Sequence, residues 1–136
     1  MIFIYTSTAL AEQEVEYPSI TSPAAYVVDQ KTGEVLLTKD SSSRRAVAST
    51  TKMITALLVL EKADPEAQVT ISDYVASTQG GTIGLKSGEK HKVRDLLYAL
   101  MLASANDAAV ALAEHIGGTE EKFAEMMTER AKELGA

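Results

Sequence analysis

A hydroxyl and an amine lie one helical turn apart at the start of an apolar segment. Ser49 and Lys52 are followed by the run 53–60, in which only Thr55 is polar. Side chains three positions apart on a helix share one side, so the Lys52 amine would come within reach of the Ser49 hydroxyl. Burial disfavours an ammonium ion and makes the neutral amine available as a base. This pair predicts a serine nucleophile activated by a lysine.

The same two residues also have a purely structural interpretation. Serine is a preferred cap at a helix N-terminus, and a lysine can lay its stem on apolar surface while its ammonium group stays in water. The Ser-x-x-Lys spacing is not specific, because a second copy, from Ser87 to Lys90, lies in a glycine turn where nothing would bury the lysine. Position alone leaves both interpretations of Ser49 and Lys52 open.

A second polar cluster, Ser104 and Asn106, lies further along the chain. In a catalytic site, Ser104 would relay a proton and the amide of Asn106 would hold a substrate carbonyl. The structural alternative is a cap between two helices, because Ser, Asn and the following Asp107 are preferred helix starters. Each motif alone is ambiguous, whereas the two motifs in this order favour catalysis.

The sequence gives little support for a catalytic triad, a metal site, a P-loop or a nucleic-acid interface. His91 and His115 lack the carboxylate and serine partners of a triad, and no metal-ligand spacing is present, so we expect no metal and no cofactor. The segment 80–87 resembles a P-loop, but Leu85 occupies the position of its second glycine.

The net charge is −6 and no Lys/Arg-rich block occurs, which argues against nucleic acid as a partner. Without cysteine there is no disulfide framework.

Composition and the N-terminal segment suggest how the chain is organised. Its 136 residues are 46% hydrophobic and 24% charged, which is typical of a globular domain. Residues 1–11 are mostly apolar and end in the small-x-small pattern Ala9-Leu10-Ala11, so we expect a signal-peptide remnant there; the alternative is a short strand at an ordinary N-terminus. Residues 12–23 are polar and contain prolines, which predicts a linker. No apolar stretch reaches the ~20 residues that a membrane span needs.

The remaining residues predict an α+β fold with an unfinished sheet. Segments 24–29 and 34–38 read as two strands around the turn 30–33, and two strands alone form a marginal sheet. A helix over about 50–63 follows and ends before Pro65. The next expected elements are a short strand at 68–71, a helix start at 72–73 and a short extended segment at 83–85. Three helices follow. The first begins at Val93 and ends at the break 104–106, the second runs from that break to Gly117, and the third runs from Thr119 to Gly135.

The order and spacing of these motifs resemble the secreted serine-type D-alanyl-D-alanine carboxypeptidases, which are the low-molecular-mass penicillin-binding proteins. The resemblance covers nearly everything after Pro23. It runs through segments 25–29, 31–36, 44–45, 48–53, 84–86, 96–98, 104–109 and 123–135. It implies the β-lactamase/transpeptidase fold and a hydrolase that removes the terminal D-alanine of a peptidoglycan stem peptide through an acyl-enzyme.

The resemblance also implies a role for each candidate residue. Ser49 corresponds to the nucleophile, Lys52 to its base, Ser104 to the relay and Asn106 to a substrate contact. Val47 stands where the family usually has proline. The implied partners are stem peptides ending in D-Ala-D-Ala, with β-lactams as covalent inhibitors. The implied location is outside the cytoplasm, in the cell envelope, and the protein would be exported. The resemblance also implies a role in cell-wall synthesis and cell shape. Membrane anchoring would occur only through a missing C-terminal region.

One family feature has no counterpart downstream of Ser104. The family's Lys-Thr-Gly strand binds the substrate carboxylate, but the similar tripeptides here, at 31–33 and 86–88, look like turns that precede Ser104. We therefore expect residues 24–136 to be the N-terminal part of a truncated catalytic domain. Two alternatives stay open. One is a β-lactamase or related penicilloyl-serine enzyme, although Asp107-Ala108-Ala109 and the lack of a deacylating Glu segment argue against it. The other is a non-catalytic fragment or binding module of the same fold.

Overall fold

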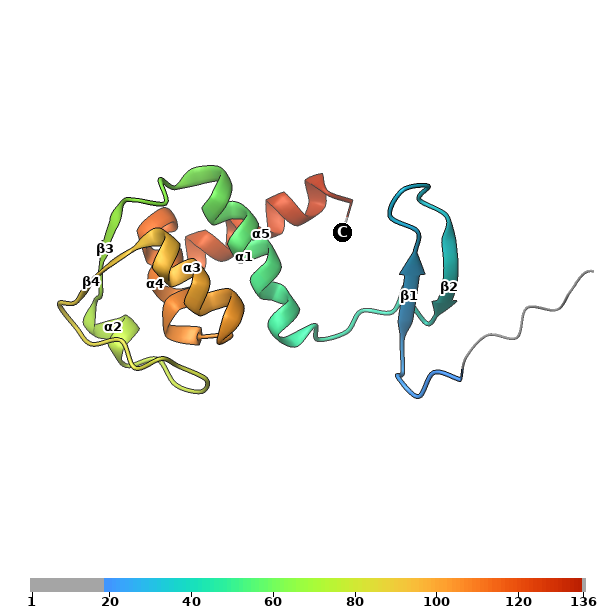
Figure 1. Ribbon diagram of the computed structural model, residues 1–136, viewed down its shortest axis with the longest axis horizontal. Helices are drawn as coiled ribbons and strands as arrows, with labels where there is room; N and C mark the ends of the chain where they lie inside the picture. The colour runs from blue at the N-terminus through green and yellow to red at the C-terminus, as the bar shows by residue number, and fades with distance from the viewer. Residues whose placement is uncertain (1–18, 136) are drawn as a thin grey trace, which may run out of the picture. The chain divides into compact units, whose positions relative to one another are not determined.

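The computed structural model describes residues 19–135, which form two compact units, one up to Arg45 and one from Ala46 onward (Figure 1). The expected signal-peptide remnant at 1–11 and most of the expected linker at 12–23 lie outside the described residues. Within residues 19–135, no helix is both long enough and apolar enough to span a bilayer.

The first unit is the predicted hairpin. β1 (Ala25–Val28) and β2 (Val35–Lys39) pair antiparallel, and the register shifts between Val27 and Val28. Their turn is organised by Asp29, whose Oδ1 accepts hydrogen bonds from the backbone N–H groups of Lys31 at 2.9 Å and Thr32 at 2.7 Å. Gly33 then takes a φ of +74°, which favours glycine. A carboxylate at the first position of the turn and a glycine at its end therefore fix the hairpin.

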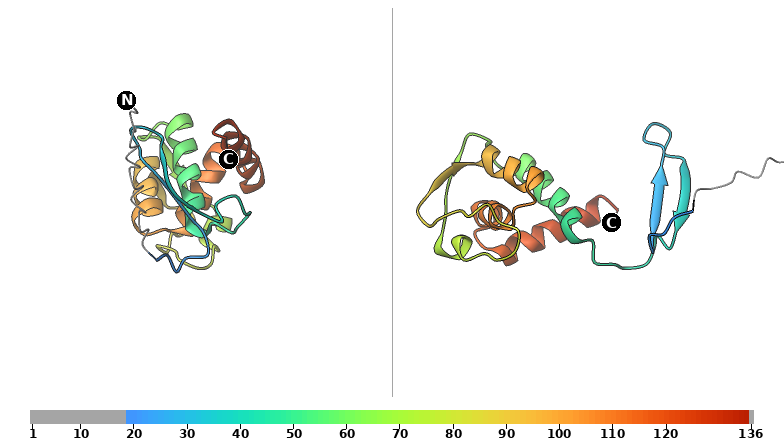
Figure 2. Two further views of the ribbon diagram at one scale, coloured as in Figure 1. Left: turned by 90° about the vertical axis from the view of Figure 1, so that its right-hand side faces the viewer. Right: turned by 60° about the horizontal axis from the view of Figure 1, so that its bottom comes forward.

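The second unit is a helical cluster built around one central helix. Its helices are a 3₁₀ turn η1 (Ala48–Thr50), α1 (Thr51–Lys62), α2 (Asp73–Ala76), α3 (Val93–Leu102), α4 (Asn106–Gly117) and α5 (Glu120–Glu133). α4 packs against α1, α2, α3 and α5 (Figure 2). Small side chains on α4, such as Ala108 and Ala111, are buried and allow its neighbours to approach closely. The large side chains of this unit that are fully buried are Leu58, Val59, Ile71, Val75, Val93, Leu96, Leu100, Phe123 and, on α4 itself, Leu112.

Helix ends follow the predicted signals. Ser72 caps α2 by accepting a hydrogen bond from the Val75 N–H, and Thr119 caps α5 by accepting one from the Lys122 N–H. α4 ends at Gly117 and is followed by the cap residue Gly118, which has a φ of +77°. These caps confirm the predicted boundaries of the last two helices to within a few residues.

Two local features differ from the sequence-based expectation. β3 (Gln68–Thr70) was predicted, but it pairs with β4 (Lys90–Lys92), a strand whose three polar residues carry no apolar alternation. The expected extended segment at 83–85 pairs with neither sheet of the described residues, and its N–H groups instead bind a side chain of α4. The mixture of helices and two-stranded sheets nevertheless confirms the α+β class.

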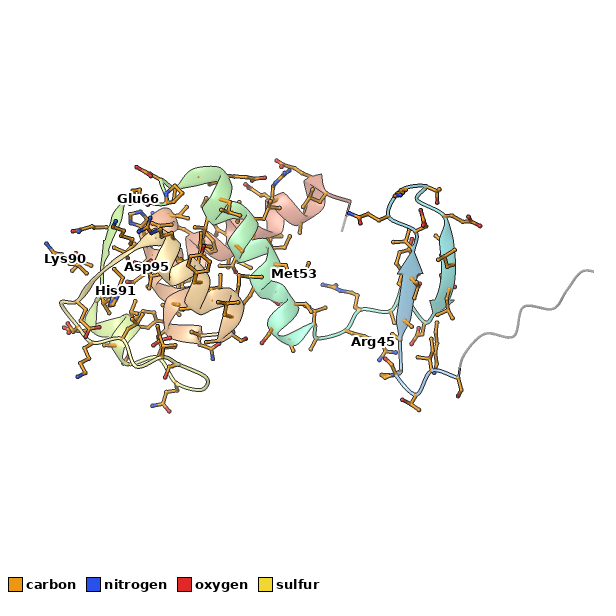
Figure 3. The ribbon with its side chains drawn as sticks, viewed as in Figure 1. Arg45, Met53, Glu66, Lys90, His91 and Asp95 are labelled. Atoms are coloured by element: carbon orange, nitrogen blue, oxygen red, sulfur yellow. The ribbon has the colours of Figure 1, made fainter. Side chains whose placement is uncertain are left out.

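α1 is buried on one side. Thr55, Leu58 and Val59 face the core, whereas the side chains of Met53 (marked in Figure 3) and Leu60 are 64% and 65% exposed. Thr55, the polar residue of the apolar run, is therefore inside the unit. Its hydroxyl lies 3.9 Å from the sulfur of Met127 on α5.

Candidate active site

Ser49 lies in the 3₁₀ turn that leads into α1. The preceding Ala48 has a φ of +46°, in the left-handed region that is uncommon for alanine. The Thr50 N–H donates to the Val47 carbonyl at 3.1 Å and closes the turn. A non-glycine residue held in this region stores backbone strain, which is a frequent property of functional sites. The turn leaves Ser49 exposed at the start of the helix.

Lys52 binds three oxygen atoms. Its Nζ donates to the Ser104 carbonyl at 2.6 Å, to the Ser104 Oγ at 3.0 Å and to the Asn106 Oδ1 at 2.7 Å. An ammonium group has three N–H donors, so every one of them has an acceptor. The side chain is half-buried. The site thus offers an acceptor to each N–H of an ammonium group placed between α1 and the turn that precedes α4.

Ser104 connects the lysine to Ser49. Its hydroxyl donates to the Ser49 Oγ at 3.0 Å while its oxygen accepts from Lys52. Lys52 forms no direct hydrogen bond to Ser49 in the described part of the chain, although the helical spacing predicts that the two could meet. The two hydroxyls and the amine instead form one chain, Ser49–Ser104–Lys52. Its geometry would allow a proton to move between the end groups through Ser104.

The turn that carries Ser104 is shaped by its backbone. Ser104 has a φ of +52°, and the N–H groups of its neighbours Ala103 and Ala105 both donate to the Ala99 carbonyl, at 3.1 and 3.2 Å. These bonds end α3 and reverse the chain before α4 begins. They direct both the carbonyl and the hydroxyl of Ser104 toward Lys52.

Asn106 joins the site to a loop that sequence reasoning did not connect with it. The Asn106 N–H donates to the Gly81 carbonyl at 2.7 Å, and its Nδ2 donates to the Gln79 carbonyl at 3.3 Å. The neighbouring Asp107, for which the sequence predicted no role in the site, is buried and accepts N–H bonds from the same loop. The sequence shows both an acidic residue at the start of α4 and a glycine-rich segment at 80–84, but nothing in it places the two together.

The cluster opens onto a hollow between α1, α4 and α5. Its volume is about 480 Å³, and apart from Ser49 and Lys52 its walls are mostly apolar, including Val110, Phe123 and Met127. A second hollow of about 440 Å³ shares Asn106 and Val110 with the first and reaches α2.

The edge of the second hollow is polar. There the Glu120 carboxylate accepts a hydrogen bond from the Tyr74 hydroxyl at 2.9 Å, and this bond raises the pKa of Tyr74. Glu120 also lines the first hollow, so the two hollows meet beside Asn106 and Glu120.

The structure brings the four predicted site residues, Ser49, Lys52, Ser104 and Asn106, into one hydrogen-bonded cluster. The second Ser-x-x-Lys pair behaves differently, because its serine lies in an exposed turn and its lysine on β4 (Figure 3). Within residues 19–135, no three acidic, histidine or cysteine side chains are placed to hold a metal ion.

Comparison with known proteins gives consistent matches. A family model described as D-alanyl-D-alanine carboxypeptidase matches residues 11–136. D-alanyl-D-alanine carboxypeptidase DacF of Bacillus subtilis is 38% identical over 99% of this chain, and the D-alanyl-D-alanine carboxypeptidase of Streptomyces sp. strain K15 is 42% identical over 76% of it. The chain spans 37% and 38% of the length of these two relatives.

The fold has similar counterparts among solved structures. A D-alanyl-D-alanine carboxypeptidase from Mycobacterium tuberculosis superimposes with a TM-score of 0.85 at 31% identity. The alignment covers 90% of this chain and 46% of that protein. The described residues therefore have the fold of one part of that longer protein.

Proposed function

This chain belongs to the D-alanyl-D-alanine carboxypeptidase family, and on that premise we propose that it takes part in removing the terminal D-alanine from peptides that end in D-Ala-D-Ala. The observation that carries the proposal is the hydrogen-bonded chain Ser49–Ser104–Lys52. It supplies a nucleophile, a relay and a base in the order that acyl transfer needs.

The proposed acylation step begins at Ser49. Its Oγ attacks the carbonyl carbon of the penultimate D-alanine while its proton passes to the Ser104 Oγ. The Ser104 hydroxyl, which donates to Ser49 in the structure, must turn toward Lys52 so that it can pass its own proton to the neutral amine. When the C–N bond breaks, the proton returns along the same path to the leaving nitrogen of D-alanine. Water then hydrolyses the ester, releasing the shortened peptide and restoring Ser49. The ammonium form of Lys52 fits the three acceptors seen in the structure.

Asn106 has a binding role in this proposal. Its Oδ1 holds Lys52 at 2.7 Å, whereas its Nδ2 makes only a long bond of 3.3 Å to the Gln79 carbonyl. A substrate carbonyl could replace that long bond without disturbing Lys52. The amide would then orient both the substrate and the base.

The proposal extends to partners and location. The substrate would be a peptidoglycan stem peptide, β-lactams would acylate Ser49, and the protein would act outside the cytoplasm in the cell envelope. An N-terminal signal peptide, secretion and a contribution to cell shape belong to the same proposal. Its support is the family membership and the names of the relatives.

The direct test is a D-alanine release assay on a peptide ending in D-Ala-D-Ala, with the protein expressed from its complete reading frame. We expect release by the unmodified protein and none by Ser49→Ala. Ser87→Ala is the matched control, because Ser87 belongs to the exposed second Ser-x-x-Lys pair and should retain full release. Equal release by Ser49→Ala and the unmodified protein would refute the assignment.

A further inference from the structure

Asp107 is a buried carboxylate whose observed partners are backbone N–H groups. Its side chain is 2% exposed. The carboxylate oxygens accept bonds from Ile83 at 3.1 and 3.2 Å, Gly84 at 3.0 Å, Leu85 at 3.1 Å and Ala108 at 3.0 Å. None of the ion pairs found among residues 19–135 involves Asp107. A buried charge is costly unless it is hydrogen-bonded, and N–H groups at a helix N-terminus can stabilise one.

The loop that supplies these N–H groups is held from both sides. Asp107 binds its second half, at 83–85, while the carbonyls of Gln79 and Gly81 in its first half accept bonds from Asn106. Gly80 lies so close that an added Cβ would be 2.9 Å from the Asn106 Nδ2. Since residues 79–85 form no helix or strand, these contacts are what define the loop. Two consecutive residues of α4 thus hold one loop.

We propose that Asp107 is a positioning residue that acts through this loop to fix the side chain of Asn106. With the loop anchored on Asp107, the Gln79 carbonyl holds the Asn106 Nδ2, and the Asn106 Oδ1 is directed at Lys52. Asp107 itself forms no hydrogen bond to Ser49, Lys52 or Ser104 among the described residues. Its effect on the site therefore runs through Asn106. Only the consequence for catalysis rests on the proposed function.

Asp107→Asn tests the proposal with almost no change in shape. The amide offers one acceptor oxygen in place of two, and its NH₂ group would face backbone donors. By NMR, we expect the N–H groups of Gly84 and Leu85 to exchange with solvent at least about tenfold faster. We also expect the side-chain NH₂ signals of Asn106 to shift. Since the lost charge adjoins Asn106 and would itself shift these signals, the deciding comparison is the same shift in Gly84→Ala, where a purely structural role for Asp107 would loosen the loop without moving them.

The matched control is Glu114→Gln. Glu114 is also a partly buried carboxylate of α4, but it accepts a bond from Ser72, the cap of α2, at 2.8 Å and forms no hydrogen bond to the loop among the described residues. It should leave both the exchange rates and the Asn106 signals unchanged. If Asp107→Asn does not fold, Gly84→Ala gives the same test, because Gly84 has a φ of +78° and an added Cβ would meet nothing within 4 Å. It should move the Asn106 signals in the same direction.

A kinetic measurement adds the catalytic consequence. With penicillin as the probe, Asp107→Asn should lower the acylation rate constant at saturation by roughly tenfold or more, with a smaller change in the half-saturating concentration. If the unmodified protein is not acylated, the proposed function fails while the NMR comparison still tests Asp107. Asn106 signals in Asp107→Asn and Gly84→Ala that match those of the unmodified protein would overturn the inference.

Discussion

Replacing Gly80 with alanine should destabilise the protein more than the same change at Gly88. Both glycines have a left-handed φ, +94° at Gly80 and +82° at Gly88. An alanine in that region costs about 1–2 kcal/mol, and this cost is common to the two variants. The surroundings differ, because an added Cβ at Gly88 would meet nothing within 4 Å, whereas at Gly80 it would lie 2.9 Å from the Asn106 Nδ2.

The extra cost at Gly80 follows from what Asn106 would lose. To clear the new methyl group, its side chain must move away from the Gln79 carbonyl and from Lys52, to which it is bonded at 3.3 and 2.7 Å. The first is a weak neutral hydrogen bond worth about 0.5 kcal/mol, and the second is charge-assisted and worth about 1.5 kcal/mol at a half-exposed site. Gly80→Ala should therefore lose about 2 kcal/mol more than Gly88→Ala.

Urea unfolding of the two variants beside the unmodified protein measures this difference. Similar slopes with shifted midpoints would show that only the stability has changed. A difference below about 0.5 kcal/mol, which is the usual size of a neutral surface effect, would refute the packing of Gly80 against Asn106.

Three further predictions concern separate parts of the molecule. Lys52→Arg should abolish acylation by penicillin while leaving the protein folded, because a guanidinium group stays protonated; near-normal acylation by intact-mass measurement would exclude the base role. Phe123→Ala should lower the free energy of unfolding by about 3–5 kcal/mol, because Phe123 is only 2% exposed. Tyr98 is 65% exposed, so Tyr98→Ala should lower it by about 0.5 kcal/mol or less. Similar losses for the two variants would contradict the described core. Hydrogen bonds from Thr32 and Lys31 lower the pKa of Asp29 in the folded protein. The stability that Asp29 contributes is therefore present above its ordinary pKa of 3.8, and it is lost as the pH falls through the lower pKa of the folded state. An NMR titration of the Thr32 N–H should give a midpoint below 3.8, and a midpoint at or above 3.8 would contradict the turn geometry.

Much of the fold could be predicted because its signals are local. The hairpin depends on two short apolar runs around a turn with Asp29 and Gly33, and α5 depends on the cap at Thr119. β4 could not be found in this way, because Lys90, His91 and Lys92 become a strand only by pairing with β3. The exposed side of α1 was also beyond local reasoning, since its apolar sequence does not show which residues face the other helices.

The residues of the candidate site were also predictable from the sequence, whereas the contacts that orient them were not. Ser49, Lys52, Ser104 and Asn106 were predicted from residue type and order, and the structure brings them together, while their roles stay predictions. Half of the hydrogen bonds that orient them are accepted by backbone carbonyls. The Ser104 carbonyl binds Lys52, and the Gln79 and Gly81 carbonyls bind Asn106. Backbone groups carry no sequence signature, so Asp107 and the loop 79–85 could be recognised only in three dimensions.

The most direct measurement of the central claim is the position of the adduct formed with penicillin. The protein expressed from its complete reading frame would be treated with benzylpenicillin, and the modified residue located by intact-mass measurement and peptide mapping. The hydrogen-bonded chain Ser49–Ser104–Lys52 predicts one adduct per chain, on Ser49, and none in Ser49→Ala. An adduct on Ser87 or Ser104 with Ser49 unmodified would contradict the account.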